Sequence, residues 1–120
     1  MYNQGNIVLI NIPFSDLKPV KKRPVLIVSK DEYNNKQQDI IVVAITSNIT
    51  TKDYVAEFDN TDMKQGTIIK KSCVRADKIL SLDKSLVIKQ FGTVSDDIMT
   101  KTINLIADVI SNQAKTKKSQ

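Results

Sequence analysis

Histidine and tryptophan are missing from this 120-residue chain, and cysteine occurs once, at Cys73. Without histidine the chain can form no Ser-His or Cys-His pair, so the general bases left to it are carboxylates, lysines and tyrosines. A single cysteine cannot form an internal disulfide, and no zinc-type spacing surrounds it, which predicts a reducing setting. We expect Cys73 to be a small buried apolar residue rather than a nucleophile.

Glycine is also scarce, and apolar runs are short. The three glycines form no Gly-rich phosphate loop, and the carboxylates lack the spacing of a metal cluster, so we predict neither metal nor cofactor. No apolar run is long enough to cross a bilayer, and the N-terminus lacks the charged and apolar regions of a signal peptide. We therefore expect a cytoplasmic protein without a membrane segment.

The chain does have material for a core and an excess of positive charge. Hydrophobic residues make up 41% of the sequence, which is enough for one domain. We place this domain at residues 1–112 and expect a disordered basic tail at 113–120, where the apolar pattern stops. The 18 Lys and Arg exceed the 13 Asp and Glu, which favours an anionic partner such as nucleic acid or an acidic protein.

Short apolar, β-branched runs separated by polar turns dominate the chain. They predict about six closely spaced strands, which favours a small barrel over a parallel α/β sheet. The expected strands cover residues 7–12, 25–28, 40–45, 54–58, 66–74 and 86–91. The continuous second run predicts burial on both faces or a tightly curved sheet. We expect the third run to be the most central strand, the fourth to lie at or near an edge, 14–22 to be a loop, and Gly92 to begin a turn.

Helical signals are fewer. Residues 30–36 and 77–83 each predict one helical turn, and a longer helix is expected after Ser95. Ser95 is a candidate N-cap, and the two aspartates that follow it complement the helix dipole. Apolar residues then recur at helical spacing, at Ile98, Met99, Ile103, Ile106, Val109 and Ile110. The predicted fold class is therefore mainly β with a C-terminal α-helix.

Two strand ends carry groups that suit a phosphate. Arg23 opens the second run, and Thr46 and Ser47 close the third. In an antiparallel hairpin the start of one strand lies beside the end of the next, so these groups converge on a candidate anion site, where a guanidinium clamps phosphate oxygens through charge-assisted hydrogen bonds. The alternative is a solvated strand start beside Lys21 and Lys22, followed by an ordinary polar turn.

A second candidate is the segment 74–77, with the sequence Val-Arg-Ala-Asp. If a strand extends this far, Arg75 and Asp77 are two residues apart and share one face. A carboxylate beside an arginine can accept a proton from a substrate hydroxyl while the arginine faces a phosphate. The alternative is a surface ion pair worth about 0 to 1 kcal/mol.

In their order along the chain, these segments resemble the MazF/PemK family of toxins from bacterial toxin-antitoxin pairs. The resemblance covers most of residues 5–110 and rests on Gly5-Asn6-Ile7-Val8-Leu9 with Pro13, Arg23-Pro24-Val25-Leu26-Ile27-Val28-Ser29, Ala44-Ile45-Thr46-Ser47, Ser72-Cys73-Val74-Arg75-Ala76-Asp77-Lys78-Ile79, and the helix from Ser95. The chain departs from many members at residues 14–22, a loop that is short here and holds neither glycine nor glutamate.

The resemblance implies a compact SH3-like barrel, a homodimer and a metal-independent endoribonuclease that cuts RNA at short sequences. It also implies a cognate antitoxin whose extended segment occupies the RNA groove. The resemblance also implies site residues. In members with matching positions, the arginine and threonine that correspond to Arg23 and Thr46 form one catalytic pair, whereas other members use those that correspond to Arg75 and Asp77. This chain has both sets.

The mechanism that we predict is attack of a ribose 2′-hydroxyl on its own 3′-phosphate, which gives a 2′,3′-cyclic phosphate and a 5′-hydroxyl. Asp77 is the expected base. Arg23 and Arg75 are expected to stabilise the phosphate charge, and Thr46 to orient the phosphate. The expected RNA contacts are Lys21, Lys22, Ser47 and Asn48. A non-catalytic RNA-binding barrel and a barrel that binds an acidic peptide stay open as alternatives.

Overall fold

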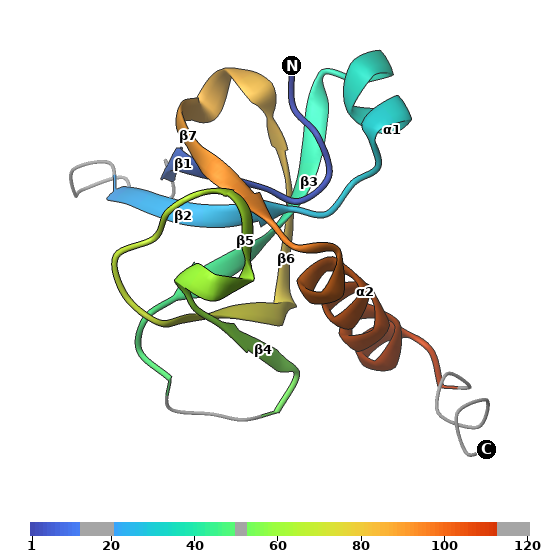
Figure 1. The fold of residues 1–120 in the computed structure, drawn as a ribbon. Helices are drawn as coiled ribbons and strands as arrows, with labels where there is room; N and C mark the ends of the chain where they lie inside the picture. The colour runs from blue at the N-terminus through green and yellow to red at the C-terminus, as the bar shows by residue number, and fades with distance from the viewer. Residues whose placement is uncertain (13–20, 50–52, 113–120) are drawn as a thin grey trace.

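The computed structural model describes residues 1–12, 21–49 and 53–112 (Figure 1). Its strands are β1 (Asn6–Ile12), β2 (Lys21–Ile27), β3 (Asp39–Thr46), β4 (Val55–Phe58), β5 (Met63–Gly66), β6 (Ser72–Asp83) and β7 (Val87–Val94). Its helices are α1 (Asp31–Lys36) and α2 (Asp96–Ile110), with short 3-10 turns at Asn60–Asp62 and Lys84–Leu86. The prediction of a mainly β fold with a C-terminal helix is confirmed, and the predicted tail at 113–120 lies outside the described residues.

The described strands form one antiparallel sheet in the order β4-β6-β3-β2-β1-β7-β5, and Figure 1 shows that this sheet is strongly curved. The prediction of an edge strand at 54–58 is confirmed by β4. β2 is the middle strand of this order, so the prediction that the strand at 40–45 is the most central is wrong by one place. Lys21 and Lys22 pair with β1 and are not part of a loop.

Successive residues of β2 are buried on opposite faces of the sheet. Leu26 belongs to the larger hydrophobic core, whereas Val25 and Ile27 belong to a second core. The larger core also contains Ile7, Val43, Phe58, Val74, Val94 and Met99. The second core also contains Val8, Ile10, Ile40 and Val42. This two-sided burial explains the continuous apolar run, because neither face of β2 is left for polar side chains.

The prediction of a helical turn at 77–83 is wrong, because these residues form the second half of β6. Leu80 and Leu82 pack against the second core, and Ser81 between them is exposed, which is the period of two that marks a half-buried strand. Residues 79–83 pair with β3, which lies far away in the sequence. This long-range pairing overrides the local preference for a turn.

β5 and β7 approach each other closely at Gly66 and Gly92, which are paired. A Cβ atom on Gly66 would lie 2.3 Å from the carbonyl oxygen of Phe91, and Gly66 has a φ of +81°. Gly92 lies inside β7, so the prediction that it begins a turn is wrong. The predicted strand 66–74 is also divided, because β5 ends at Gly66 and β6 begins at Ser72.

A buried polar network holds α1 and the N-terminus on the sheet. The side-chain amide of Asn34 donates to the carbonyl oxygens of Tyr2 and Ser29, at 3.2 and 3.0 Å. The Ser29 hydroxyl donates to the amide oxygen of Asn34 and accepts from the backbone N–H of Ile41 on β3. Asn34 is buried because these partners replace water. The predicted helical turn at 30–36 is confirmed, but nothing in its local sequence indicated the network.

The helix α2 begins as predicted, since the Ser95 hydroxyl accepts a hydrogen bond from the backbone N–H of Ile98 at 3.3 Å. The first turns of α2 bury Ile98 and Met99 in the larger core, and the helix packs against β4 and β6. Farther along, Leu105 and Ile106 still pack against the larger core, whereas Ile103, Val109 and Ile110 are exposed. No helix in the described part of the chain is long and apolar enough to span a membrane.

We predict that Gly66→Ala lowers the free energy of unfolding by about 2 kcal/mol or more, because alanine adds strain at positive φ to a backbone collision. Chemical denaturation followed by circular dichroism measures this change. Gln65→Ala, at the exposed neighbouring position of β5, is the control and is expected to change the free energy by less than about 0.5 kcal/mol. Equal stability of Gly66→Ala and the wild type would refute the close approach of the two strands.

Candidate active site

The register of β6 against β3 breaks at one point. Val43 of β3 pairs with Ile79, but its neighbour Ala44 pairs with Arg75. Residues 76–78 of β6 therefore have no counterpart on β3, which makes this segment a β-bulge. Bulges re-aim side chains, and they are common next to active sites.

The bulge turns its residues in different directions. Ala76 is buried, and its backbone N–H donates to the carbonyl oxygen of Tyr54 at 2.9 Å, which ties the bulge to the residue before β4. Tyr54 itself has a φ of 57°, an uncommon conformation for a residue with a side chain. Asp77 and Lys78 are exposed. The inward alanine thus leaves an aspartate and a lysine projecting beside β3.

Arg75 and Asp77 form the ion pair predicted from their spacing. Nε of Arg75 donates to Oδ1 of Asp77, and Nη2 donates to Oδ2, each at 3.1 Å. The side chains are 26% and 33% exposed, so the pair is open to a ligand. The hydrogen bonds from Arg75 hold the pKa of Asp77 below its ordinary value against the opposing effect of burial, and Asp77 in turn raises the pKa of Arg75.

Arg23 and Asp77 line the same hollow, although they lie on strands separated by β3. The hollow has a volume of about 370 Å³, and we call it the arginine hollow. Its described lining consists of Ile12, Arg23, Pro24, Val25, Ala44, Ile45, Asp77, Lys78, Ile79 and Leu80. Ala44 of β3 explains the meeting, because it pairs with β2 on one side and with Arg75 on the other. A small side chain between the two strands leaves room for an anion.

Thr46 is the predicted catalytic residue with the weakest structural link to the arginine hollow. It ends β3, opposite Cys73, and its hydroxyl accepts a hydrogen bond from the backbone N–H of Asn48 at 3.0 Å. Ala44 of β3 pairs with Val25 of β2. Thr46 follows Ala44 by two residues and Arg23 precedes Val25 by two, so Thr46 and Arg23 lie at corresponding positions of the antiparallel pair β2 and β3. Thr46 does not belong to the described lining of the arginine hollow.

The predicted RNA contacts lie around this hairpin. Lys21 and Lys22 are exposed at the start of β2, and Ser47 and Asn48 are exposed directly after β3. Ser47 lines a second hollow of about 450 Å³, which we call the lysine hollow. The four residues therefore surround the Arg23 end of the hairpin, but they do not share one cavity.

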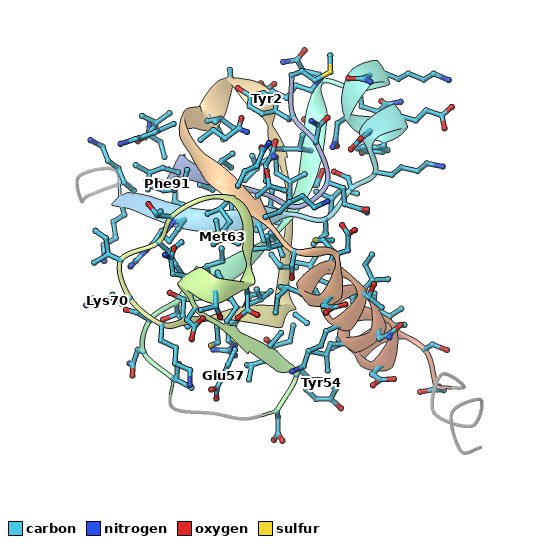
Figure 2. All side chains as sticks on the ribbon, viewed as in Figure 1. Tyr2, Tyr54, Glu57, Met63, Lys70 and Phe91 are labelled. Atoms are coloured by element: carbon cyan, nitrogen blue, oxygen red, sulfur yellow. The ribbon has the colours of Figure 1, made fainter. Side chains whose placement is uncertain are left out.

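Sequence reasoning missed most of the lysine hollow. Its described lining consists of Ile7, Pro24, Ile45, Ser47, Phe58, Thr67, Ile68, Ile69, Lys70, Ser72, Lys89 and Phe91. Figure 2 shows Lys70 and Phe91 on the same side of the molecule, and Nζ of Lys89 lies 5.4 Å from the centre of the Phe91 ring. Pro24 and Ile45 also line the arginine hollow, so the two hollows are neighbours. The one feature of the sequence that could have indicated this hollow was the pair of lysines, Lys70 and Lys71, within a β-rich run.

A metal ion is held by His, Cys, Asp or Glu side chains that lie close together. Within residues 1–12, 21–49 and 53–112, no three His, Cys, Asp or Glu side chains gather closely enough to hold a metal ion. Cys73 is buried, which agrees with its predicted role as a small apolar residue. The charged groups in the described lining of the arginine hollow are Arg23, Asp77 and Lys78, and Arg75 joins them through its contact with Asp77.

Comparison with solved structures identifies the fold. The chain is similar to an endoribonuclease in complex with its cognate antitoxin from a Mycobacterial species, with a TM-score of 0.75, 21% identity, and coverage of 92% of this chain and 95% of that one. It is similar to another endoribonuclease from a Mycobacterial species, with a TM-score of 0.71, 23% identity, and coverage of 91% and 90%. For MazE-MazF (Form-II) from Deinococcus radiodurans the TM-score is 0.72, with 20% identity and coverage of 91% and 95%.

The sequence itself matches a family over almost the whole described chain. The model of the PemK-like, MazF-like toxins of type II toxin-antitoxin systems covers residues 3–110. This span includes both strands of the hairpin, the bulge of β6 and the whole of α2. It confirms the family that the order of the sequence motifs indicated. The chain belongs to the PemK-like, MazF-like toxin family of type II toxin-antitoxin systems.

Proposed function

We propose that this toxin is a sequence-specific, metal-independent endoribonuclease that cuts single-stranded RNA. The observation that carries the proposal is the arginine hollow, in which Arg23 and Asp77 share one cavity and Asp77 is bound to Arg75. Guanidinium groups bind phosphate oxygens in pairs, and a carboxylate can take a proton. Family membership and the two endoribonucleases of the same fold support the reaction class.

The proposed reaction is an internal displacement at phosphorus. The ribose 2′-oxygen forms a bond with phosphorus as its proton passes to Asp77, and the bond from phosphorus to the 5′-oxygen breaks. The leaving 5′-oxygen takes a proton from water, and the products are a 2′,3′-cyclic phosphate and a 5′-hydroxyl. Since the nucleophile is already tethered to the phosphate, positioning supplies much of the acceleration and no metal-bound water is required.

The other predicted residues have roles that follow from their chemistry. Arg23 and Arg75 stabilise the charge that develops on the phosphate oxygens, and electrostatic stabilisation suits them better than proton donation because guanidinium stays protonated. Thr46 orients the phosphate through its hydroxyl. Contacts to the rest of the RNA come from Lys21, Lys22, Ser47 and Asn48.

We also propose the partners that such a toxin requires. A cognate antitoxin masks the RNA site, as suggested by the antitoxin complexes of proteins with this fold. Residues 1–112 act as the functional unit, which has an SH3-like barrel. The reaction takes place in the cytoplasm, where a protein with one cysteine has no need of an internal disulfide. Capture of an acidic protein encoded next to the toxin tests for the antitoxin. If the captured protein does not block RNA cleavage, the proposed masking is rejected.

A homodimer is the assembly that we propose. The end of α2 exposes apolar side chains at Ile103, Val109 and Ile110 that one chain leaves uncovered. Light scattering of the purified protein is expected to give twice the 13.5 kDa of one chain. A mass of one chain at micromolar concentration would reject the dimer.

A second candidate function is RNA binding without cleavage. It is favoured by the low pKa of Asp77, because a carboxylate that gives up its proton readily is a weak base. A non-catalytic protein would bind RNA with an affinity that falls steeply as salt rises, and it would leave the RNA intact. Binding of an acidic peptide at the same cationic site is a further form of this alternative.

We predict that the purified protein cuts long RNA in the presence of EDTA and that Arg23→Ala and Asp77→Asn each reduce the rate by about 100-fold or more. Gel analysis of the fragments measures the rate, and mass spectrometry identifies the 2′,3′-cyclic phosphate. Lys30→Ala, which removes an exposed cation beside α1, is the matched control and should cut at the wild-type rate. No cleavage by the wild type, or equal cleavage by all variants, would reject the proposed reaction.

The pH dependence has a definite sign. Asp77 acts as a base only when ionised, and Arg75 lowers its pKa, so cleavage by the free enzyme is lost only when the pH falls through this lowered value. Arg75→Gln removes the hydrogen bonds that stabilise the carboxylate, so the pKa rises and the acid limb of kcat/KM moves to higher pH. Rates measured between acid and neutral pH test this shift. An acid limb that stays in place would show that Asp77 is not the base.

A further inference from the structure

The contact between Arg75 and Asp77 uses the same donors that a phosphate needs. Nε and Nη2 of Arg75 both point at the Asp77 carboxylate, at 3.1 Å each. A carboxylate and a phosphodiester each offer two oxygens to this fork, so they compete for one position. We propose that Asp77 occupies Arg75 in the free protein as a stand-in for phosphate, and that an RNA phosphate releases it. This inference rests on the proposed function and concerns how the same site becomes active.

The pair is built so that it can open. Arg75 and Asp77 are only two residues apart in the bulge of β6, so the contact is made within one short segment. Rotation of the Asp77 side chain breaks it without moving the strands. Asp77 is 33% exposed, which leaves room for the carboxylate to turn toward solvent. Exchange of one anion for another therefore needs no change of fold.

The position of Asp77 makes it the group that an incoming phosphate meets. Asp77, Arg23 and Lys78 line the arginine hollow, and Arg75 is not part of its described lining. A phosphate drawn in by Arg23 and Lys78 therefore meets the aspartate first, and it reaches Nε and Nη2 of Arg75 by taking the place of the aspartate. The two neighbouring cations compensate for bringing a second anion next to the first.

The exchange resolves the conflict between the two roles of the pair. While Arg75 holds Asp77, the carboxylate is a weak base, and the Nε and Nη2 donors of the guanidinium are taken. Once a phosphate takes the guanidinium, Asp77 loses two hydrogen bonds from a cation and gains an anionic neighbour. Both changes favour its protonated form, so its basicity rises. The base and the stabilising cation thus become available in the same step, and only when substrate is bound.

The test is a double-mutant cycle on binding. The ligand is a fluorescent pool of random-sequence 2′-O-methyl RNA oligonucleotides, which keeps the phosphates and cannot be cut. Its affinity is measured by anisotropy for the wild type, Asp77→Asn, Arg75→Gln and the double variant. If Asp77 competes for Arg75, Asp77→Asn tightens binding by about threefold or more when Arg75 is present and has no such effect in the Arg75→Gln background.

The control separates competition from simple charge repulsion. Asp39→Asn removes a negative charge at the opposite end of β3, away from the fork, and it should leave the affinity nearly unchanged. Equal tightening by Asp77→Asn with and without Arg75 would mean repulsion alone and would overturn the inference. So would no tightening in either background. If none of the proteins binds the oligonucleotides, the proposed function fails together with the inference.

Cleavage gives a second readout. Asp77→Asn is expected to lower kcat while it lowers KM, because it removes the base and also the competitor for Arg75. A residue with a merely structural role would not improve binding while it abolishes turnover. If the wild type cuts RNA but the wild type and Asp77→Asn have equal KM values, the proposed endoribonuclease activity stands and the proposed exchange of Asp77 for phosphate is rejected.

Discussion

The interruption of the β3 and β6 pairing is the constraint on which the site depends. Up to Arg75, the strand β6 lies between β3 and β4, and from Ile79 onward it pairs with β3 again in a shifted register. The three intervening residues cannot follow the ladder. Because Ala76 is held inward by Tyr54, Asp77 and Lys78 project over the small side chain of Ala44 toward β2. A regular β6 would have placed them in register with β3 and would have separated the aspartate from Arg23.

The same geometry bears on how the proposed reaction proceeds without histidine. The sequence contains no histidine, and the only carboxylate in the described lining of the arginine hollow is bound by an arginine. The proposed reaction therefore relies on where groups are placed and when they become free. In it, the tethered 2′-hydroxyl, the arginines on either side of β3 and a base released by substrate take the place of a histidine.

Much of this site was predictable from the sequence, because its parts depend on local pattern. A period of two placed Arg75 and Asp77 on one face, and two apolar runs with polar ends predicted the hairpin that carries Arg23 and Thr46. The bulge was not predictable, since it arises from pairing with a strand remote in sequence. For the same reason residues 77–83, with alternating polar positions, were mistaken for a helical turn.

Glycines and aromatic residues show the same limit. Gly92 looked like a turn, but its lack of a side chain serves a close approach to Gly66, which local sequence does not reveal. Phe58 belongs to the larger core and Phe91 packs against it, and only the fold shows that both also line the lysine hollow next to Ser47. Such features depend on which strands become neighbours, and strands that pair can lie far apart in the sequence.

A crystal structure with a non-cleavable 2′-O-methyl oligonucleotide tests the central claim most directly. The account predicts one phosphate in the arginine hollow, with its oxygens within hydrogen-bonding distance of Arg23 and Arg75 and with Asp77 turned toward the 2′-oxygen. A phosphate bound on another surface, or one held in the hollow while Arg75 still grips Asp77, would contradict it.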